Sequence, residues 1–220
     1  GGKVRFSLSK PASMVNVEYD PEFLKENLEV TRASTPDLAD ITITDFCSEG
    51  CDFCYMDSTI HGKHAEYKDI SNILKSLADM KVFEVAIGGG APLSHPDFIK
   101  ILKRARRLGI VPNFTTRSIA WINKPIAKQV MKYAGSFAVS VDSHKKVFKL
   151  SKLLKSAGIG VDRVNLHVVM GTVTREEYNK ILVAASRKGL RVTLLGYKDI
   201  GRGSSVQKID YSWWLEDLKV

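Results

Sequence analysis

The chain has 220 residues, of which 44% are hydrophobic, and its formal net charge is +9. This length suits one domain, or one domain with a small extension, and the apolar content is enough to bury a core. The chain lacks a run of about 18 apolar residues, which argues against a membrane-spanning helix, and residues 1–14 lack the apolar centre of a secretory signal. We therefore expect a cytoplasmic protein with no membrane partner.

Residues 1–40 are predicted to form an irregular N-terminal extension, with strands at 4–8 and 15–19. From residue 41, short runs rich in Val and Ile alternate with amphipathic segments. The runs have the length and composition of buried parallel strands, and we expect strands at 41–46, 82–87, 110–115, 136–141, 163–169 and 191–195. The amphipathic segments have the apolar period of helices, which we expect at 69–80, 96–108, 124–134, 145–157 and 174–188.

This repeat of six strands and five helices predicts an α/β fold with one parallel sheet and the helices outside it. We expect a partial (β/α)6 barrel over residues 41–200, with a flat doubly wound sheet as the alternative. Residues 201–220 are predicted to form a C-terminal loop and a short helix at 211–218. In either architecture, functional residues are expected at the carboxyl ends of the strands.

Several of the basic residues lie on two of the predicted helices, at residues 103–107 and 145–155. Basic runs of this kind are usually the solvated outer faces of helices. They can also form a surface that binds nucleic acid or another polyanion. No nucleic-acid-binding motif accompanies the charge, so the charge alone does not identify a partner.

All three cysteines lie in one stretch of eight residues, Cys47-Ser-Glu-Gly-Cys51-Asp-Phe-Cys54. Cysteines clustered in this way do not resemble a disulfide framework. Three thiolates are too few for a four-ligand structural metal site, but they can hold three irons of a [4Fe–4S] cluster and leave the fourth iron open. The stretch directly follows the first predicted strand, where a barrel places its active-site residues.

The cysteine stretch resembles the C-x3-C-x-aromatic-C motif of the radical S-adenosylmethionine (radical SAM) superfamily, with Phe53 as the aromatic residue. The second predicted strand runs into Gly88-Gly89-Gly90, where family members carry a Gly-Gly-Glu-type motif. The resemblance implies that the backbone of these glycines receives the amino group of S-adenosylmethionine. The chain departs from the motif, because Gly90 and Ala91 stand where a Glu is often found. The resemblance covers roughly residues 41–200.

The resemblance also implies contacts with the cofactor at the ends of the next three strands. These positions match the family's contacts with the nucleoside, the ribose and the adenine, in that order: Thr115, Thr116 and Arg117; Ser140 and Asp142; Val169 and Met170. The bidentate fork of Arg117 suits the carboxylate of the cofactor. Each residue also has an ordinary structural explanation, such as helix capping by Thr and Ser or core packing by Met170.

The resemblance implies an enzyme in which a [4Fe–4S] cluster on Cys47, Cys51 and Cys54 reductively cleaves S-adenosylmethionine. The resulting 5′-deoxyadenosyl radical would abstract a hydrogen atom from a substrate. An electron donor such as flavodoxin or ferredoxin is implied as a partner. The positive charge favours a phosphate-bearing substrate, either a nucleotide or a modified base in nucleic acid. A peptide-modifying enzyme is the alternative within this class, and the lack of a second cysteine cluster counts against it.

Two residues after the sixth predicted strand, Tyr197 and Lys198, are candidate catalytic residues. Lys198 could hold an anionic group of the substrate or donate a proton. His61 and His64 follow the cysteines and could close over the site. If either histidine were a fourth ligand, the cysteines would form a tetrahedral zinc site, and the chain would be a zinc-binding module for nucleic acid. A domain of six βα units does not need zinc to fold, so the enzyme is the preferred hypothesis.

Overall fold

The computed structural model describes residues 35–213. The strands expected at 4–8 and 15–19, and most of the helix expected at 211–218, lie outside the described residues. Within residues 35–213, six strands form one sheet in the order β1-β2-β3-β4-β5-β6, and each neighbouring pair is parallel. Their bounds are β1 (Leu38–Thr42), β2 (Glu84–Gly88), β3 (Val111–Thr116), β4 (Phe137–Ser140), β5 (Val164–Val169) and β6 (Arg191–Leu195).

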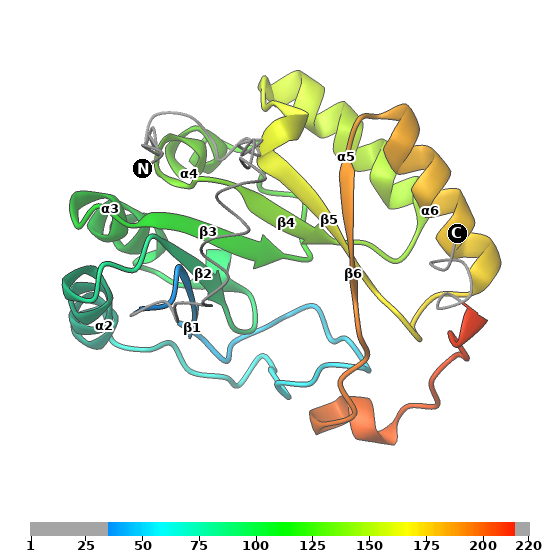
Figure 1. Ribbon diagram of the computed structural model, residues 1–220, viewed down its shortest axis with the longest axis horizontal. Helices are drawn as coiled ribbons and strands as arrows, with labels where there is room; N and C mark the ends of the chain where they lie inside the picture. Colours follow the sequence, from blue (N-terminus) through cyan, green and yellow to red (C-terminus); the bar gives the residue numbers. More distant parts are fainter. Residues whose placement is uncertain (1–34, 214–220) are drawn as a thin grey trace, which may run out of the picture.

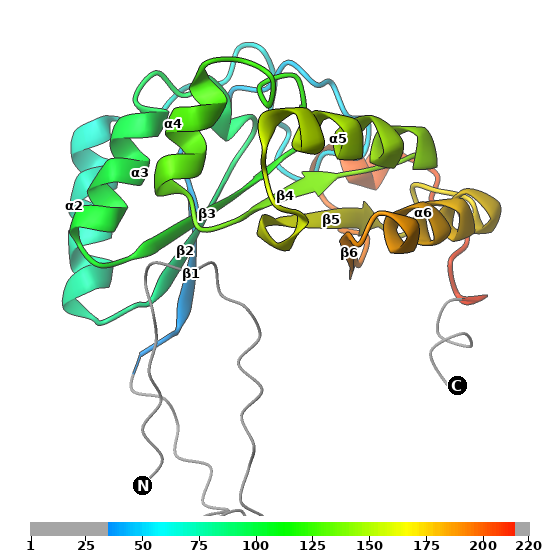
Figure 2. The same cartoon turned by 90° about the horizontal axis from the view of Figure 1, so that it is seen from above.

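One helix connects each strand to the next. These helices are α2 (Tyr67–Asp79), α3 (Phe98–Arg107), α4 (Ile126–Tyr133), α5 (His144–Ala157) and α6 (Arg175–Arg187). They lie along one face of a curved sheet, and the helices of the described part of the chain leave the opposite face uncovered (Figure 1, Figure 2). The expected partial barrel is thus confirmed, and the flat doubly wound sheet, which needs helices on both faces, is wrong. No helix within the described residues is both long and apolar enough to cross a membrane.

The main core lies between the sheet and the helices. In β3 the side chains alternate between half-buried and buried, which is the period of two expected of a strand with two different faces. Phe114 lies at the centre of the buried face, with its ring centroid 5.3 Å from that of Phe98 and 5.5 Å from that of Phe137. Removing a ring of this kind costs about 3–5 kcal/mol. This rigid side of the sheet fixes where each strand ends.

The first strand differs from the sequence prediction, which placed it at residues 41–46. β1 begins at Leu38, within the segment predicted as an extension, and ends at Thr42, which pairs with Gly88. The ladder stops there because β2 ends at Gly88 and the chain turns at Gly89, whose φ is 116°. As an edge strand with exposed residues, β1 has a weak apolar pattern, and four residues separate it from the cysteine stretch.

Candidate active site

The cysteine loop, residues 47–54, is seated on the glycine turn that follows β2. Gly90 N donates a hydrogen bond to Thr44 O at 2.8 Å, and Ala91 N donates to Phe46 O at 2.8 Å. A Cβ atom at Gly89 would overlap Thr44 O, and one at Gly90 would overlap Phe46 O. Only glycine permits this approach of two backbones. These two glycines therefore seat the segment that leads into the cysteines.

Gly88 is different from the two glycines after it. A Cβ atom at Gly88 would meet only Ile41 O, at the ordinary contact distance of 3.9 Å. The close packing thus requires glycine at the second and third positions of the turn and not at the first. The predicted contact of the turn with a cofactor stays a prediction.

The three cysteines are free thiols, and each is partly buried. Burial raises the pKa of Cys51, Arg117 counteracts that rise, and the charges of Cys47 and Cys54 add to it. The thiol of Cys51 therefore lies within electrostatic range of the other two. Within residues 35–213, no three His, Cys, Asp or Glu side chains converge closely enough to hold a metal ion. The donor set nevertheless fits an iron–sulfur cluster, because three soft sulfur ligands share one short loop.

A cation and a carboxylate from neighbouring strand ends meet beside this loop. Arg117, which follows β3, forms a hydrogen-bonded ion pair with Asp142, which lies two residues beyond β4. The guanidinium carbon of Arg117 also lies 5.6 Å from the centre of the Phe53 ring. The structure thus brings together three residues that the sequence assigned to one cofactor site.

Lys146, in the first turn of α5, is a site residue that the sequence analysis missed. Burial lowers the pKa of Lys146, Arg117 lowers it further, and Asp142, Glu49 and Cys51 act in the opposite direction. The ammonium group therefore lies near the cysteine loop and the Arg117–Asp142 pair. The basic run 145–155 in the sequence is typical of a solvated helix face. The place of Lys146 just after the carboxyl end of β4 was the signal that could have identified it.

Known proteins resemble this chain in the same part of the sequence that forms the site. The family model described as the Radical SAM superfamily matches residues 41–144, which include the cysteine loop, the glycine turn, Arg117 and Asp142. The chain therefore contains a radical SAM domain at residues 41–144. The cofactors of this superfamily are a [4Fe–4S] cluster and S-adenosylmethionine, as expected from the cysteine motif.

Curated relatives of this radical SAM chain include GTP 3′,8-cyclases. The protein of Clostridium botulinum (strain Hall) is 22% identical over an alignment of 192 positions, and the match covers 78% of this chain and 59% of that protein. The protein of Listeria monocytogenes serovar 1/2a is 27% identical, with 78% and 57% covered. The chain therefore spans less than two thirds of the length of these relatives.

Solved structures share the fold. Streptococcus suis SuiB bound to the precursor peptide SuiA matches with a TM-score of 0.71 and 20% identity, over 90% of this chain and 47% of that chain. SuiB bound to S-adenosylmethionine gives a TM-score of 0.69 and 19% identity, over 90% and 48%. HydG, a maturase of the [FeFe]-hydrogenase, gives 0.57 and 13%, over 79% and 46%. At these identities the matches establish the fold alone.

The strand pleat separates the predicted cofactor residues of the radical SAM barrel into two sets. Thr115, Ser140 and Val169 are half-buried and lie on the face away from the helices. Thr116 and Met170 are buried on the helix-covered side, and Met170 belongs to the hydrophobic core. Core packing therefore explains Met170, and the positions of these two side chains do not support their predicted contacts with the cofactor.

The two candidate catalytic residues both contact other parts of the protein. The hydroxyl group of Tyr197 donates a hydrogen bond to Gly203 O at 2.8 Å. The ammonium nitrogen of Lys198 lies 4.1 Å from the centre of the Tyr55 ring, next to the cysteine loop. The structure therefore brings Lys198 to the cysteine loop, and the catalytic roles of both residues stay predictions.

The histidines do not complete a zinc site. Nδ1 of His64 lies 2.8 Å from Thr44 Oγ1, and the ring packs against Phe46 and His95, with centroids 5.5 and 5.1 Å apart. His64 thus joins the segment after the cysteines to the end of β1, and His61 is exposed. The radical SAM match over residues 41–144 favours the enzyme over the alternative of a zinc-binding module.

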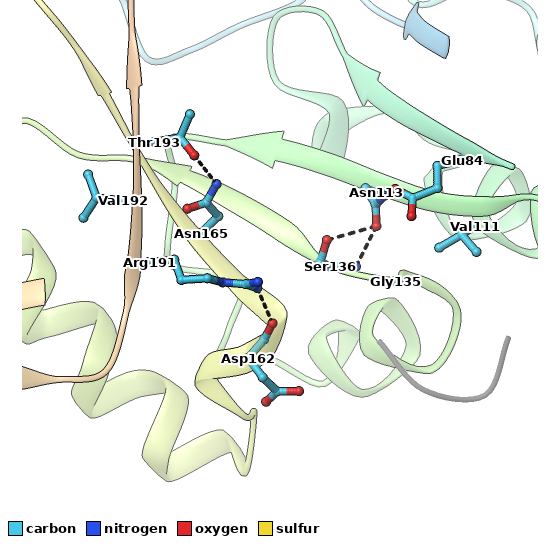
Figure 3. A pocket seen from close by; sticks show the side chains of 10 residues that line it. All are labelled: Glu84, Val111, Asn113, Gly135, Ser136, Asp162, Asn165, Arg191, Val192 and Thr193. Atoms are coloured by element: carbon cyan, nitrogen blue, oxygen red, sulfur yellow. Dashed lines mark hydrogen bonds between the residues drawn. The ribbon is translucent and has the colours of Figure 1, made fainter. Parts of the chain in front are cut away.

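A cavity of about 550 Å³ lies at the other end of the sheet (Figure 3). Asn113 donates to the Glu84 carboxylate at 2.7 Å and accepts hydrogen bonds from Ser136, and Asn165 donates to Thr193 Oγ1 at 2.6 Å. The cavity opens at the amino ends of the strands, far from the expected position of functional residues. It is lined by Glu84, Val111, Asn113, Gly135, Ser136, Asp162, Asn165, Arg191, Val192 and Thr193.

Proposed function

We propose that this chain carries the active site of a radical SAM enzyme, with Cys47, Cys51 and Cys54 as ligands of a [4Fe–4S] cluster. The observation that carries the proposal is the position of the cysteine loop. It is seated by Gly89 and Gly90 at the carboxyl end of the sheet, beside charged residues from the next strand ends. When bound, the cluster supplies the single electron that begins radical chemistry on S-adenosylmethionine.

The protein's own residues bind and orient the cofactor. Arg117 is suited to its carboxylate because a guanidinium offers two parallel donors. Asp142 is suited to ribose hydroxyl groups, which donate to a carboxylate. Since the two residues pair with each other in this structure, both roles require that their ion pair opens and that each residue takes a new partner on the cofactor.

Two further groups surround this pair. The ring of Phe53 lies beside the guanidinium group of Arg117. Lys146 adds a second positive charge to the same end of the barrel. Together with Lys198 near Tyr55, these cations favour an anionic ligand.

For the substrate, we infer a nucleotide as the first candidate. The support is that relatives matching 78% of this chain are GTP 3′,8-cyclases, together with the cations around the cysteine loop. A peptide is the second candidate, because SuiB, which shares the fold, was solved with a precursor peptide. A one-electron donor protein such as flavodoxin or ferredoxin completes the proposed system.

The cluster is tested by anaerobic reconstitution with iron and sulfide. We expect about four irons per chain, and production of 5′-deoxyadenosine after addition of dithionite and S-adenosylmethionine. Cys51→Ala should lose the cluster, and Ser48→Ala, an exposed position in the same loop, should keep it. A colourless wild-type protein that retains only zinc after reconstitution would overturn the proposal.

The substrate is tested by label transfer. Deuterated GTP and a deuterated peptide are offered separately to the reconstituted chain, and the 5′-deoxyadenosine is analysed by mass spectrometry. Deuterium in 5′-deoxyadenosine from GTP alone would support a nucleotide substrate. Deuterium from the peptide alone would support a peptide substrate and rule out the nucleotide.

A further inference from the structure

The segment after β6 crosses the open side of the barrel at its carboxyl end. β1 and β6 are the two edges of the sheet and do not pair with each other. Beyond β6, the chain forms a 3-10 turn, η3 (Gly201–Ser205), which packs against the segment that follows β1 (Figure 1). The turn therefore joins the two edges at the level of the cysteine loop.

Arg202 makes most of this connection. Its backbone N–H donates to Cys54 O at 3.1 Å, and its Nε donates to Cys51 O at 3.1 Å. Its Nη2 donates to the carbonyl of the buried Ser58 at 3.0 Å, and its Nη1 lies 3.8 Å from Asp57 Oδ1. One residue thus binds three carbonyl groups of a segment that lies about 150 positions earlier in the chain.

The glycines on both sides of Arg202 permit this close approach. A Cβ atom at Gly201 would lie 2.7 Å from Tyr55 O and 2.8 Å from Cys54 O, and Gly201 has a φ of 57°. A Cβ atom at Gly203 would lie 2.7 Å from Lys198 O. The Gly203 carbonyl accepts the hydrogen bond from the Tyr197 hydroxyl, and this bond ties the turn to the segment directly after β6.

The bonds have a specific direction. The acceptors are main-chain carbonyls of Cys51 and Cys54, so Arg202 fixes the backbone of the loop without using either sulfur atom. An arginine fork can reach several carbonyls at once, whereas a lysine offers one ammonium group at the end of a flexible stem. The contacts thus determine where the thiols of the loop can point.

We propose that Gly201-Arg202-Gly203 is a clamp that fixes the cysteine loop in the conformation that receives the cluster, and that Arg202 is its positioning residue. The part of this inference that concerns the cluster rests on the proposed function. The part that concerns the loop can be tested on the metal-free chain.

The first experiment measures alkylation of Cys51 and Cys54 by iodoacetamide in the anaerobic, metal-free chain, followed by mass spectrometry. Arg202→Gln and Arg202→Lys should both react about tenfold faster than wild type, because hydrogen bonds from a charged donor are lost. Arg107→Gln, at an exposed arginine of α3, should react like wild type. Unchanged rates in Arg202→Gln would overturn the clamp, and an unchanged rate in Arg202→Lys would overturn the role of the fork.

A milder variant covers the case in which Arg202 variants fail to fold. Tyr197→Phe removes only the hydroxyl group that holds Gly203, and it should raise the alkylation rate of Cys54 about threefold. Equal rates of Cys54 alkylation in Tyr197→Phe and wild type would contradict a clamp that is stabilised by the hydrogen bond of Tyr197.

The second experiment uses the reconstituted chain. Iron extraction by a chelator should be about tenfold faster in Arg202→Gln than in wild type, and the electron paramagnetic resonance signal of the reduced cluster should broaden. Arg107→Gln should change neither. If wild type binds no cluster, the proposed function fails while the alkylation result still decides the clamp. If the cluster forms, and iron extraction and the electron paramagnetic resonance signal of Arg202→Gln both match wild type, the clamp is not a positioning device.

Discussion

Arg117 and Asp142 bind each other across the ends of β3 and β4, although their sequence positions predict contacts with two different groups of one cofactor, its carboxylate and its ribose. Their side chains remain 23% and 39% exposed, so a ligand arriving from the mouth of the barrel can reach both. The ion pair holds the guanidinium beside the Phe53 ring, and in the proposed function the cofactor would take the place of Asp142. This relationship makes Arg117 the residue of the site whose substitution is most informative.

Arg117→Gln should weaken binding of S-adenosylmethionine to the reconstituted chain about tenfold, because a charge-assisted bidentate contact is lost. Equilibrium dialysis with labelled cofactor measures the dissociation constant. Arg107→Gln serves as the control, because it removes the same charge from an exposed position on α3. Equal losses in both variants would mean that net charge, and not Arg117 itself, governs the affinity.

Lys146→Gln should weaken cofactor binding less than Arg117→Gln, since an ammonium group does not form the bidentate contact. Because Lys146 and Arg117 influence each other electrostatically, the double variant should not equal the sum of the single effects. The same dialysis experiment on wild type, the two single variants and the double variant gives the coupling free energy between Lys146 and Arg117. Strict additivity would place Lys146 outside the cofactor site.

Gly90→Ala should destabilise the metal-free chain by about 1–3 kcal/mol, because the new Cβ atom would overlap Phe46 O and lie 3.0 Å from Cys47 Cβ. Gly88→Ala is the matched control, since its Cβ atom meets nothing closer than 3.9 Å. Urea unfolding followed by circular dichroism compares the two. We also expect Gly90→Ala to take up less iron, and equal stability of the two variants would contradict the proposed seat of the loop.

Acidification should destabilise the chain through His167. Burial lowers the pKa of this histidine below its ordinary value of 6.5. Between the two pKa values the unfolded chain binds more protons than the folded chain, so the free energy of unfolding falls as the pH decreases through that window and is unaffected above it. Urea unfolding at about pH 7.5 and about pH 5 measures this loss.

The histidine variants separate this effect from other acidic transitions. His167→Gln should lose less stability between the two pH values than wild type does. His61→Gln, at an exposed histidine, should behave like wild type. If the stability of His167→Gln fell by as much as that of wild type between the two pH values, the effect would belong to other groups.

The fold was largely predictable because buried parallel strands leave short Val- and Ile-rich runs in the sequence. β6 lies at residues 191–195 as expected, and β5 begins one residue late. The first strand was misplaced because an edge strand such as Leu38–Thr42 has an exposed and partly polar pattern. Proximity to a strand end does not say which face a side chain occupies, and Thr116 and Met170, both predicted contacts of the cofactor, lie buried on the helix-covered side.

Other parts of the site have no local signature. Lys146 belongs to a run of lysines, and only the carboxyl end of β4 before it distinguishes it from its neighbours. Arg202 lies in a segment that reads as a loop, and its partners are about 150 positions away. A long-range contact between a side chain and backbone carbonyls places no demand on the partner's residue types, so the sequence of the cysteine loop does not encode it.

The contacts of Arg202 also determine when, during translation, the cysteine loop becomes constrained. The ribosome adds Cys47, Cys51 and Cys54 about 150 positions before residues 201–205, so the carbonyl groups of the nascent cysteine loop lack their partner during that interval. Contacts of such high sequence separation form late in folding. The newly made thiols therefore remain unconstrained until residues 201–205 are translated, and loading of iron and sulfide is expected to follow that step.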